Sequence, residues 1–106
     1  FNAGPAARLA LRDRLLVEAD PTKRLDLISF VWQDRELESV DLLMSVVEDP
    51  SRAPHERLYA ADRAVRMGHS ERILPGLKRV YRSESDGVLR PGLHCLLWIW
   101  FGPPLG

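Results

Sequence analysis

The sequence has very little cysteine, no long apolar run and no excess of charge of either sign. Its single cysteine, Cys95, excludes an internal disulfide framework and a zinc site built from several thiolates. The longest nearly apolar run, 93–101, is far shorter than the ~20 residues needed to cross a bilayer. Fifteen Lys and Arg residues balance fifteen Asp and Glu residues. No net field therefore attracts nucleic acid or anionic lipid.

The length and composition are those of one ordinary globular domain. The chain has 106 residues, of which 45% are hydrophobic and 28% are charged. The N-terminal stretch lacks the apolar run and the cleavage pattern of a signal peptide, and we therefore expect a cytoplasmic protein. The chain begins with Phe1 rather than Met. This is typical of a processed product or of a fragment of a longer protein.

Proline and glycine divide the chain into segments of helical length. These breaks are Gly4-Pro5, Asp20-Pro21, Asp49-Pro50, Gly68, Asp86-Gly87, Pro91-Gly92 and Gly102-Pro103. Between them, apolar residues recur at steps of three and four, which is the period of an amphipathic helix. The pattern predicts helices within 5–19, 23–33, 36–48, 55–67, 70–82 and 88–101.

Helix-end signals support these segments. Asp20, Asp34 and Asp49 each precede a helical stretch and can accept backbone N–H bonds at its start. Ser70 is typical of a helix start, and Gly68 suits the left-handed residue just past a helix end.

Pro75 conflicts with a helix that begins at Ser70, because proline removes a helical hydrogen bond. We therefore expect the regular helix to begin near Leu74, with 70–73 as a preceding turn.

Three stretches share one order of features: an acidic turn, a basic residue and an apolar helix that ends in a polar or glycine break. They are 19–36, 48–71 and 84–102, and their final breaks lie about 34 residues apart. This predicts an all-α fold of six helices in three two-helix units, 5–33, 34–68 and 69–102. A non-repeating helical bundle would show the same periodicity without the matched breaks and remains the alternative.

Two stretches, LLMSVVEDPSRAPHERLYAADRAVRMG and ERILPGLKRVY, resemble HEAT repeats. The shared features are an Asp-Pro turn after the first helix, an Arg near the start of the second helix and small residues at the packing seam. Here they are Asp49-Pro50, Arg57, Ala60, Ala61 and Ala64. The resemblance covers most of 20–102. It implies a short right-handed α-solenoid of about three antiparallel repeats, forming a non-catalytic module that binds other proteins.

The sequence departs from this pattern in its first and last units. The second helix of the first unit has Phe30 and Trp32 where small residues are expected, and the last unit places Trp98, Trp100 and Phe101 within one turn.

No arrangement of reactive residues in the sequence predicts catalysis, a cofactor or a metal. His55, His69 and His94 show no metal-binding spacing. His94 and Cys95 are adjacent, so their side chains diverge by about 100° on a helix and cannot form a thiolate–imidazole pair. We expect Cys95 to be a buried small hydrophobe. We also expect the carboxylates to lie on the outer sides of their helices, and Arg57 to lie outside the apolar stripe.

Charge is distributed unevenly along the chain. Segment 34–49 has six acids and one base, whereas 63–82 has six bases and one acid. Adjacent helices with complementary charge would explain this pattern. A bipolar surface that selects partners or stacks head to tail is a second explanation, and a phosphate-contacting ridge is a third. Four arginines are the expected surface contacts: Arg63, Arg66, Arg79 and Arg82.

The third explanation gives the alternative function, because certain HEAT-like proteins bind DNA and excise alkylated bases. The chain would then be a nucleic-acid-binding relative of HEAT-like DNA glycosylases, or a HEAT-like lyase. Aromatic residues are not interleaved with the basic ones except at Tyr81, so nucleic acid is not the expected partner.

The final segment, 88–101, is apolar on all sides, although the end of a solenoid should carry a polar outer face. Either 102–105 folds back over this segment, or another chain or a further repeat covers Trp98 or Trp100. We therefore expect self-association or a protein partner through 93–105.

Overall fold

The computed structural model describes residues 5–31 and 37–102 of the chain, and the regular structure in these ranges is helical throughout. The helices are α1 (Pro5–Val17), α2 (Pro21–Val31), α3 (Leu37–Val47), α4 (Pro54–Val65), α5 (Ser70–Ser83) and α6 (Leu89–Phe101). The all-α fold class and the six helical segments predicted from the sequence are confirmed, with boundaries that differ by a few residues.

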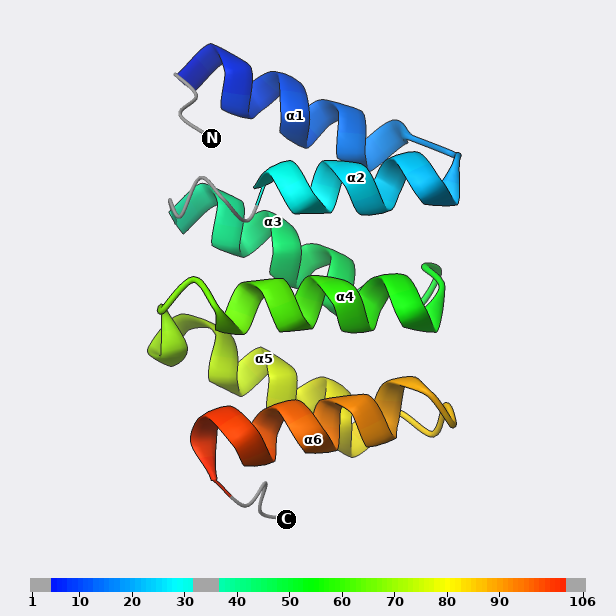
Figure 1. The fold of residues 1–106 in the computed structure, drawn as a ribbon, viewed down its shortest axis with the longest axis vertical. Helices are drawn as coiled ribbons and strands as arrows, with labels where there is room; N and C mark the ends of the chain where they lie inside the picture. The colour runs from blue at the N-terminus through cyan, green and yellow to red at the C-terminus, as the bar shows by residue number, and fades with distance from the viewer. Residues whose placement is uncertain (1–4, 32–36, 103–106) are drawn as a thin grey trace.

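The helices stack along the longest axis of an elongated molecule that measures 40 × 27 × 16 Å (Figure 1). Every pair of consecutive helices is in contact, and so is every pair of helices separated by one other helix. Thus α4 packs against α3, against α2 on one side and against α6 on the other. Helix α4 is therefore the central helix of the stack.

The core lies along α3 and α4. Ala60, Ala61 and Ala64 of α4 have no exposed surface, and Val40 and Leu43 of α3 are equally buried. Small side chains let neighbouring helices approach closely, so the alanine seam predicted from the sequence is confirmed.

The aspartates at the turns accept backbone hydrogen bonds in different settings. Oδ1 of Asp20 accepts the Thr22 N–H at 2.9 Å, as predicted for the start of α2. Asp49 accepts the Ser51 N–H at 2.9 Å instead, within a turn, and α4 begins only at Pro54, with no side-chain cap. The prediction that Asp49 caps a helix is therefore wrong. Asp34 lies outside the described residues.

Two further helix ends agree with ordinary capping rules: the start of α6 and the end of α4. Oδ1 of Asp86 accepts the N–H groups of Val88 and Leu89 at 2.8 and 2.9 Å, which secures the start of α6. Gly68 has a φ of 86°, the left-handed conformation predicted for it.

The prediction for Pro75 is wrong, because α5 begins at Ser70 and continues through the proline. Ile73 and Leu77 are both fully buried on one face of α5, and a turn over 70–73 would not place Ile73 in line with Leu77. Packing of this face outweighs the loss of one hydrogen bond at the exposed Pro75.

Gly76 of α5 lies close to α3. A Cβ atom at this position would be 2.8 Å from Met44 Cε and 2.9 Å from Glu48 Oε1. The absence of a side chain therefore sets the distance between α3 and α5.

Glu56 contradicts the expectation that the carboxylates lie on the outer sides of their helices. It is 1% exposed in the first turn of α4. It accepts hydrogen bonds from Nε of Arg24 at 2.8 Å and from Nη1 of Arg52 at 2.7 Å. These two arginines also donate to carbonyls in and just after the last turn of α1, Arg24 to Ala19 at 3.0 Å and Arg52 to Leu15 at 3.2 Å. Burial is tolerated because the charge is paired on both sides.

Arg57 is also buried, at 6% exposure, and not outside the core as expected. Its Nε donates to the Val47 carbonyl at the end of α3 at 2.9 Å, and its Nη1 donates to Glu84 just after α5 at 3.0 Å. Arg57 therefore satisfies one of the end carbonyls of α3 and joins α4 to the end of α5.

Replacing Ala61 with Leu should overpack the α4 seam and lower the free energy of unfolding by about 1–3 kcal/mol. Ala10→Leu is the matched control, because Ala10 is exposed on α1. Urea unfolding measures both variants. Equal midpoints for the Ala61 variant and the wild type would place Ala61 outside the packed seam.

Glu56→Gln should remove the charge that holds two arginines while keeping the side-chain shape. Breaking a buried charge pair from one side costs about 3–5 kcal/mol. The control is Asp41→Asn, which breaks the exposed ion pair between Asp41 and Arg72 and should cost little because water screens that pair. Similar losses in the two variants would contradict the structural role of Glu56.

Stability should depend on pH through Asp86. The backbone N–H groups of Leu89 and Val88 hold the pKa of this carboxyl below its usual value of 3.8. The resulting stabilisation is present above pH 4 and is lost as the pH falls through the folded-state pKa. The stability advantage of wild type over Asp86→Asn, followed by thermal unfolding, should therefore shrink from pH 5 to pH 3. A constant difference over this range would exclude the carboxylate cap as its source.

Candidate functional site

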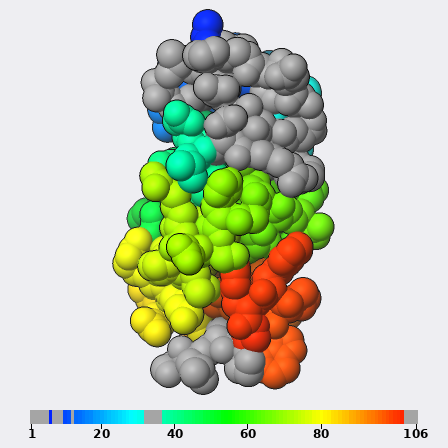
Figure 2. All heavy atoms as spheres, turned by 90° about the vertical axis from the view of Figure 1, so that its left-hand side faces the viewer, coloured from blue at the N-terminus to red at the C-terminus, as the bar shows by residue number. Residues whose placement is uncertain are grey.

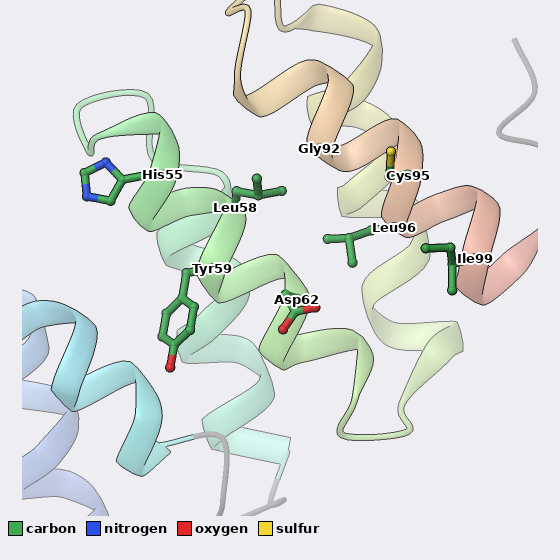
Figure 3. A pocket seen from close by; sticks show the side chains of 8 residues that line it. All are labelled: His55, Leu58, Tyr59, Asp62, Gly92, Cys95, Leu96 and Ile99. Atoms are coloured by element: carbon green, nitrogen blue, oxygen red, sulfur yellow. The ribbon is translucent and has the colours of Figure 1, made fainter.

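An apolar groove of about 390 Å³ runs between α4 and α6 (Figure 3). Each helix contributes four residues at the same spacing, so each presents one stripe two turns long. The lining residues are His55, Leu58, Tyr59 and Asp62 of α4, and Gly92, Cys95, Leu96 and Ile99 of α6. Every α6 position lies 37 residues after its counterpart on α4.

Gly92 brings the two walls of the groove together. A Cβ atom on Gly92 would lie 2.4 Å from Cδ2 of Leu58, so any side chain here would push α6 away from α4. Pro91-Gly92 is one of the breaks noted in the sequence and also lies within the predicted helical segment 88–101; the structure places both residues in the first turns of α6. Pro91 is tolerated there because the first N–H groups of a helix have no partner within it.

The surface that lines the groove is mainly apolar. Leu58 and Leu96 point toward each other across it, whereas Tyr59 points toward α2 (Figure 3). The Tyr59 hydroxyl forms a hydrogen bond with Oγ of Ser29 on α2, and the guanidinium of Arg63 lies 4.6 Å from the centre of the tyrosine ring. These contacts fix one wall of the groove.

Two of the predicted arginines meet at Asp62. Nη1 of Arg63 lies 3.2 Å from this carboxylate, and Nε of Arg66 lies 3.1 Å from it. Asp62 raises the pKa of Arg66 through this hydrogen bond. Arg66 also lies 5.7 Å from the ring centre of Trp100, so the structure brings together three of the residues singled out from the sequence.

The outer side of α6 carries the largest exposed apolar residues near the groove. Trp98 is 56% exposed and Ile99 is 72% exposed. Cys95 is exposed beside them, which corrects the expectation that it is buried. We call Cys95, Trp98 and Ile99 the α6 face. A second hollow of about 300 Å³ lies on it, and Figure 2 shows side chains of α6 at the surface below those of α4.

Arg79 and Arg82 lie on α5. Arg79 pairs with Glu48, the residue that follows α3, and Arg72 pairs with Asp41 of α3 at 2.6 Å. Arg72 lowers the pKa of Asp41 through this hydrogen bond. The interpretation that adjacent helices carry complementary charge is confirmed for α3 and α5. Arg82 is exposed in the last turn of α5.

Two histidines lie near the groove and the α6 face. His94 Nδ1 lies 3.0 Å from the Tyr81 hydroxyl, and His55 is exposed at one end of the groove. The described residues include no group of three or more His, Cys, Asp or Glu side chains placed to hold a metal ion.

The groove was not predicted from the sequence. Its signal is the matched pair of stripes on α4 and α6, which is recognisable only once the two helices are known to lie side by side. The predicted fold-back of 102–105 over α6 falls mainly on 103–106, outside the described residues.

Comparison of the chain with family models, curated proteins and solved structures finds no match. Within the described residues, no helix combines the length and the apolar character that crossing a membrane requires.

Proposed function

We propose that this chain is a short module of HEAT-like repeats that binds another protein through the α4–α6 groove and the α6 face. The observation that carries the proposal is the open apolar groove beside the exposed side chains of Trp98 and Ile99. Large exposed apolar patches on soluble proteins mark interaction sites.

Two arginines at matched positions, Arg24 and Arg57, support a repeat. Arg24 and Arg57 lie 33 residues apart, each near the start of the second helix of its pair. Arg24 donates to the carbonyl of Ala19, after α1, and Arg57 to the carbonyl of Val47, at the end of α3. Each also pairs with a carboxylate of the following helix pair, Glu56 for Arg24 and Glu84 for Arg57. The same residue type thus makes the same two connections in successive units.

The order of helix contacts also favours a solenoid over an irregular bundle. Each helix contacts its neighbours one and two places along the chain, as stacked two-helix units require. The units would be α1 with α2, α3 with α4, and α5 with α6, in agreement with 5–33, 34–68 and 69–102.

The shape of the groove suits an amphipathic helix. The lining stripes extend over seven residue steps on α4 and α6, a length of about 10 Å. A helix docked in such a groove inserts apolar side chains spaced three or four residues apart. Leu58 and Leu96 supply apolar walls, and the Asp62–Arg66 pair supplies a polar rim at one end.

The nucleic-acid alternative has less support. Three of the four arginines singled out from the sequence, Arg63, Arg66 and Arg79, already pair with carboxylates. Phosphate contacts would have to compete with these ion pairs.

A displayed library of 16-residue peptides, selected on the immobilised chain, tests the proposal. Selected peptides should carry apolar residues at helical spacing. Their binding, measured by fluorescence polarisation, should weaken at least tenfold with Ile99→Asp. The matched control is Val17→Asp on α1, because Val17 is 77% exposed and Ile99 is 72% exposed.

Two results would contradict the proposed function. One is that the selected peptides bind the Ile99 variant and the wild type equally well. The other is tight binding of a DNA duplex that weakens steeply with added salt, which would favour the nucleic-acid alternative.

A further inference from the structure

We propose that two copies of this chain associate about a two-fold axis, with Trp98 of each copy inserted into the α4–α6 groove of the other. This inference rests on the proposed function, since it uses the same groove and the same α6 face, and it names the partner as a second copy.

Trp98 stands where α4 has a small residue. At the 37-residue spacing that relates the two walls of the groove, Trp98 corresponds to Ala61. Ala61 is completely buried in the packing around α4, whereas Trp98 is 56% exposed. An indole in this position keeps a further helix from packing on α6 as closely as α6 packs on α4. The α6 face therefore requires a partner with a cavity, and not simply another close-packed helix.

The groove supplies a cavity of suitable size and chemistry. Its volume of about 390 Å³ leaves room for an indole ring, and pockets of roughly 300–1,000 Å³ are those that hold apolar groups in proteins. Leu58, Leu96 and Ile99 would contact the ring. The carboxylate on its rim, Asp62, is already paired with Arg66, so an incoming apolar side chain leaves no charge newly unpaired.

The projecting side chain and the cavity belong to one continuous surface. The groove and the hollow beside Trp98 share Cys95 and Ile99 in their linings. A patch that contains both a projection and a matching cavity can pair with itself about a two-fold axis, and such pairing closes after two copies. Head-to-tail stacking, in contrast, would use opposite ends of the molecule and would continue beyond two.

The size of the patch predicts a weak dimer. An aromatic side chain buries about 150–250 Å², so two tryptophans account for about 300–500 Å² of the roughly 1,600 Å² in an interface of standard size. Ile99 and the groove walls would add to this area. We expect a dissociation constant in the micromolar range.

Sedimentation equilibrium between about 1 and 300 µM tests the dimer. The wild-type mass should rise with concentration and level off at twice the monomer mass. Trp98→Ala should weaken association at least tenfold. Trp100→Ala is the matched control and should leave it unchanged, because Trp100 lies against Arg66 and is not among the groove-lining residues.

A second measurement follows the indole itself. Tryptophan emission of the wild type should shift to shorter wavelength as the dimer forms, and the shift should be absent in Trp98→Ala. Circular dichroism checks that the variant is folded, as expected for a substitution at an exposed position.

A wild-type monomer at 300 µM would overturn the inference. A mass that rises beyond two copies would also overturn it. Equal dimerisation of Trp98→Ala and the wild type, or an equal loss of association in Trp98→Ala and Trp100→Ala, would do the same. If the protein stays monomeric while Ile99→Asp still weakens the selected peptides, the proposed function stands and only the second copy is excluded. If the peptides also ignore Ile99, the proposed function fails with it.

Discussion

The fold depends on the paired charges at the start of α4. Glu56 holds Arg24 and Arg52 on one side, while the adjacent Arg57 extends to Glu84 on the other. Two consecutive residues therefore connect the start of α4 to Arg24 of α2, to Arg52 in the preceding turn and to Glu84 just after α5, all along one side of the stack. A buried charge that loses its partner is costly, so sliding one helix pair along another would be opposed by every member of this cluster. Glu84 lies in the connection between α5 and α6, so this constraint also restricts where α6 begins beside α4.

Packing at the middle of the stack differs from packing at its end. Around α4, the small side chains of Ala60, Ala61 and Ala64 are completely buried between neighbouring helices. On α6, the residue that corresponds to Ala61 is Trp98, which is 56% exposed, and the neighbouring Ile99 is 72% exposed. The same all-helical packing thus gives a closed seam around α4 and an open surface on α6. The change comes from side-chain size and from the absence of a further helix among the described residues.

The sequence predicted what depends on local periodicity and missed what depends on neighbours distant along the chain. The six helices and the alanine seam follow from apolar spacing within each segment. The burial of Glu56 and Arg57 depends on partners in distant segments of the chain. Because local periodicity does not reveal those partners, the sequence predicted that both side chains would be solvated. Pro75 led to a predicted helix start near Leu74, and Pro91-Gly92 was interpreted as a break, because the local penalties of proline and glycine are known, whereas the packing that outweighs those penalties is tertiary. The groove went unseen for the same reason, since it exists only where Gly92 meets Leu58.

Gly76 and Gly92, at the α3–α5 and α4–α6 contacts, affect the curvature of the stack. Gly76 brings α5 close to α3 in one row of helices, and Gly92 brings α6 close to α4 in the other. Because both glycines shorten the distance between neighbouring helices, the row that contains α3 and α5 and the row that contains α4 and α6 keep similar lengths here. A side chain at only one of these positions would lengthen one row and bend the molecule toward the opposite row. The lack of two Cβ atoms therefore helps to set the direction in which α6 presents its outer face.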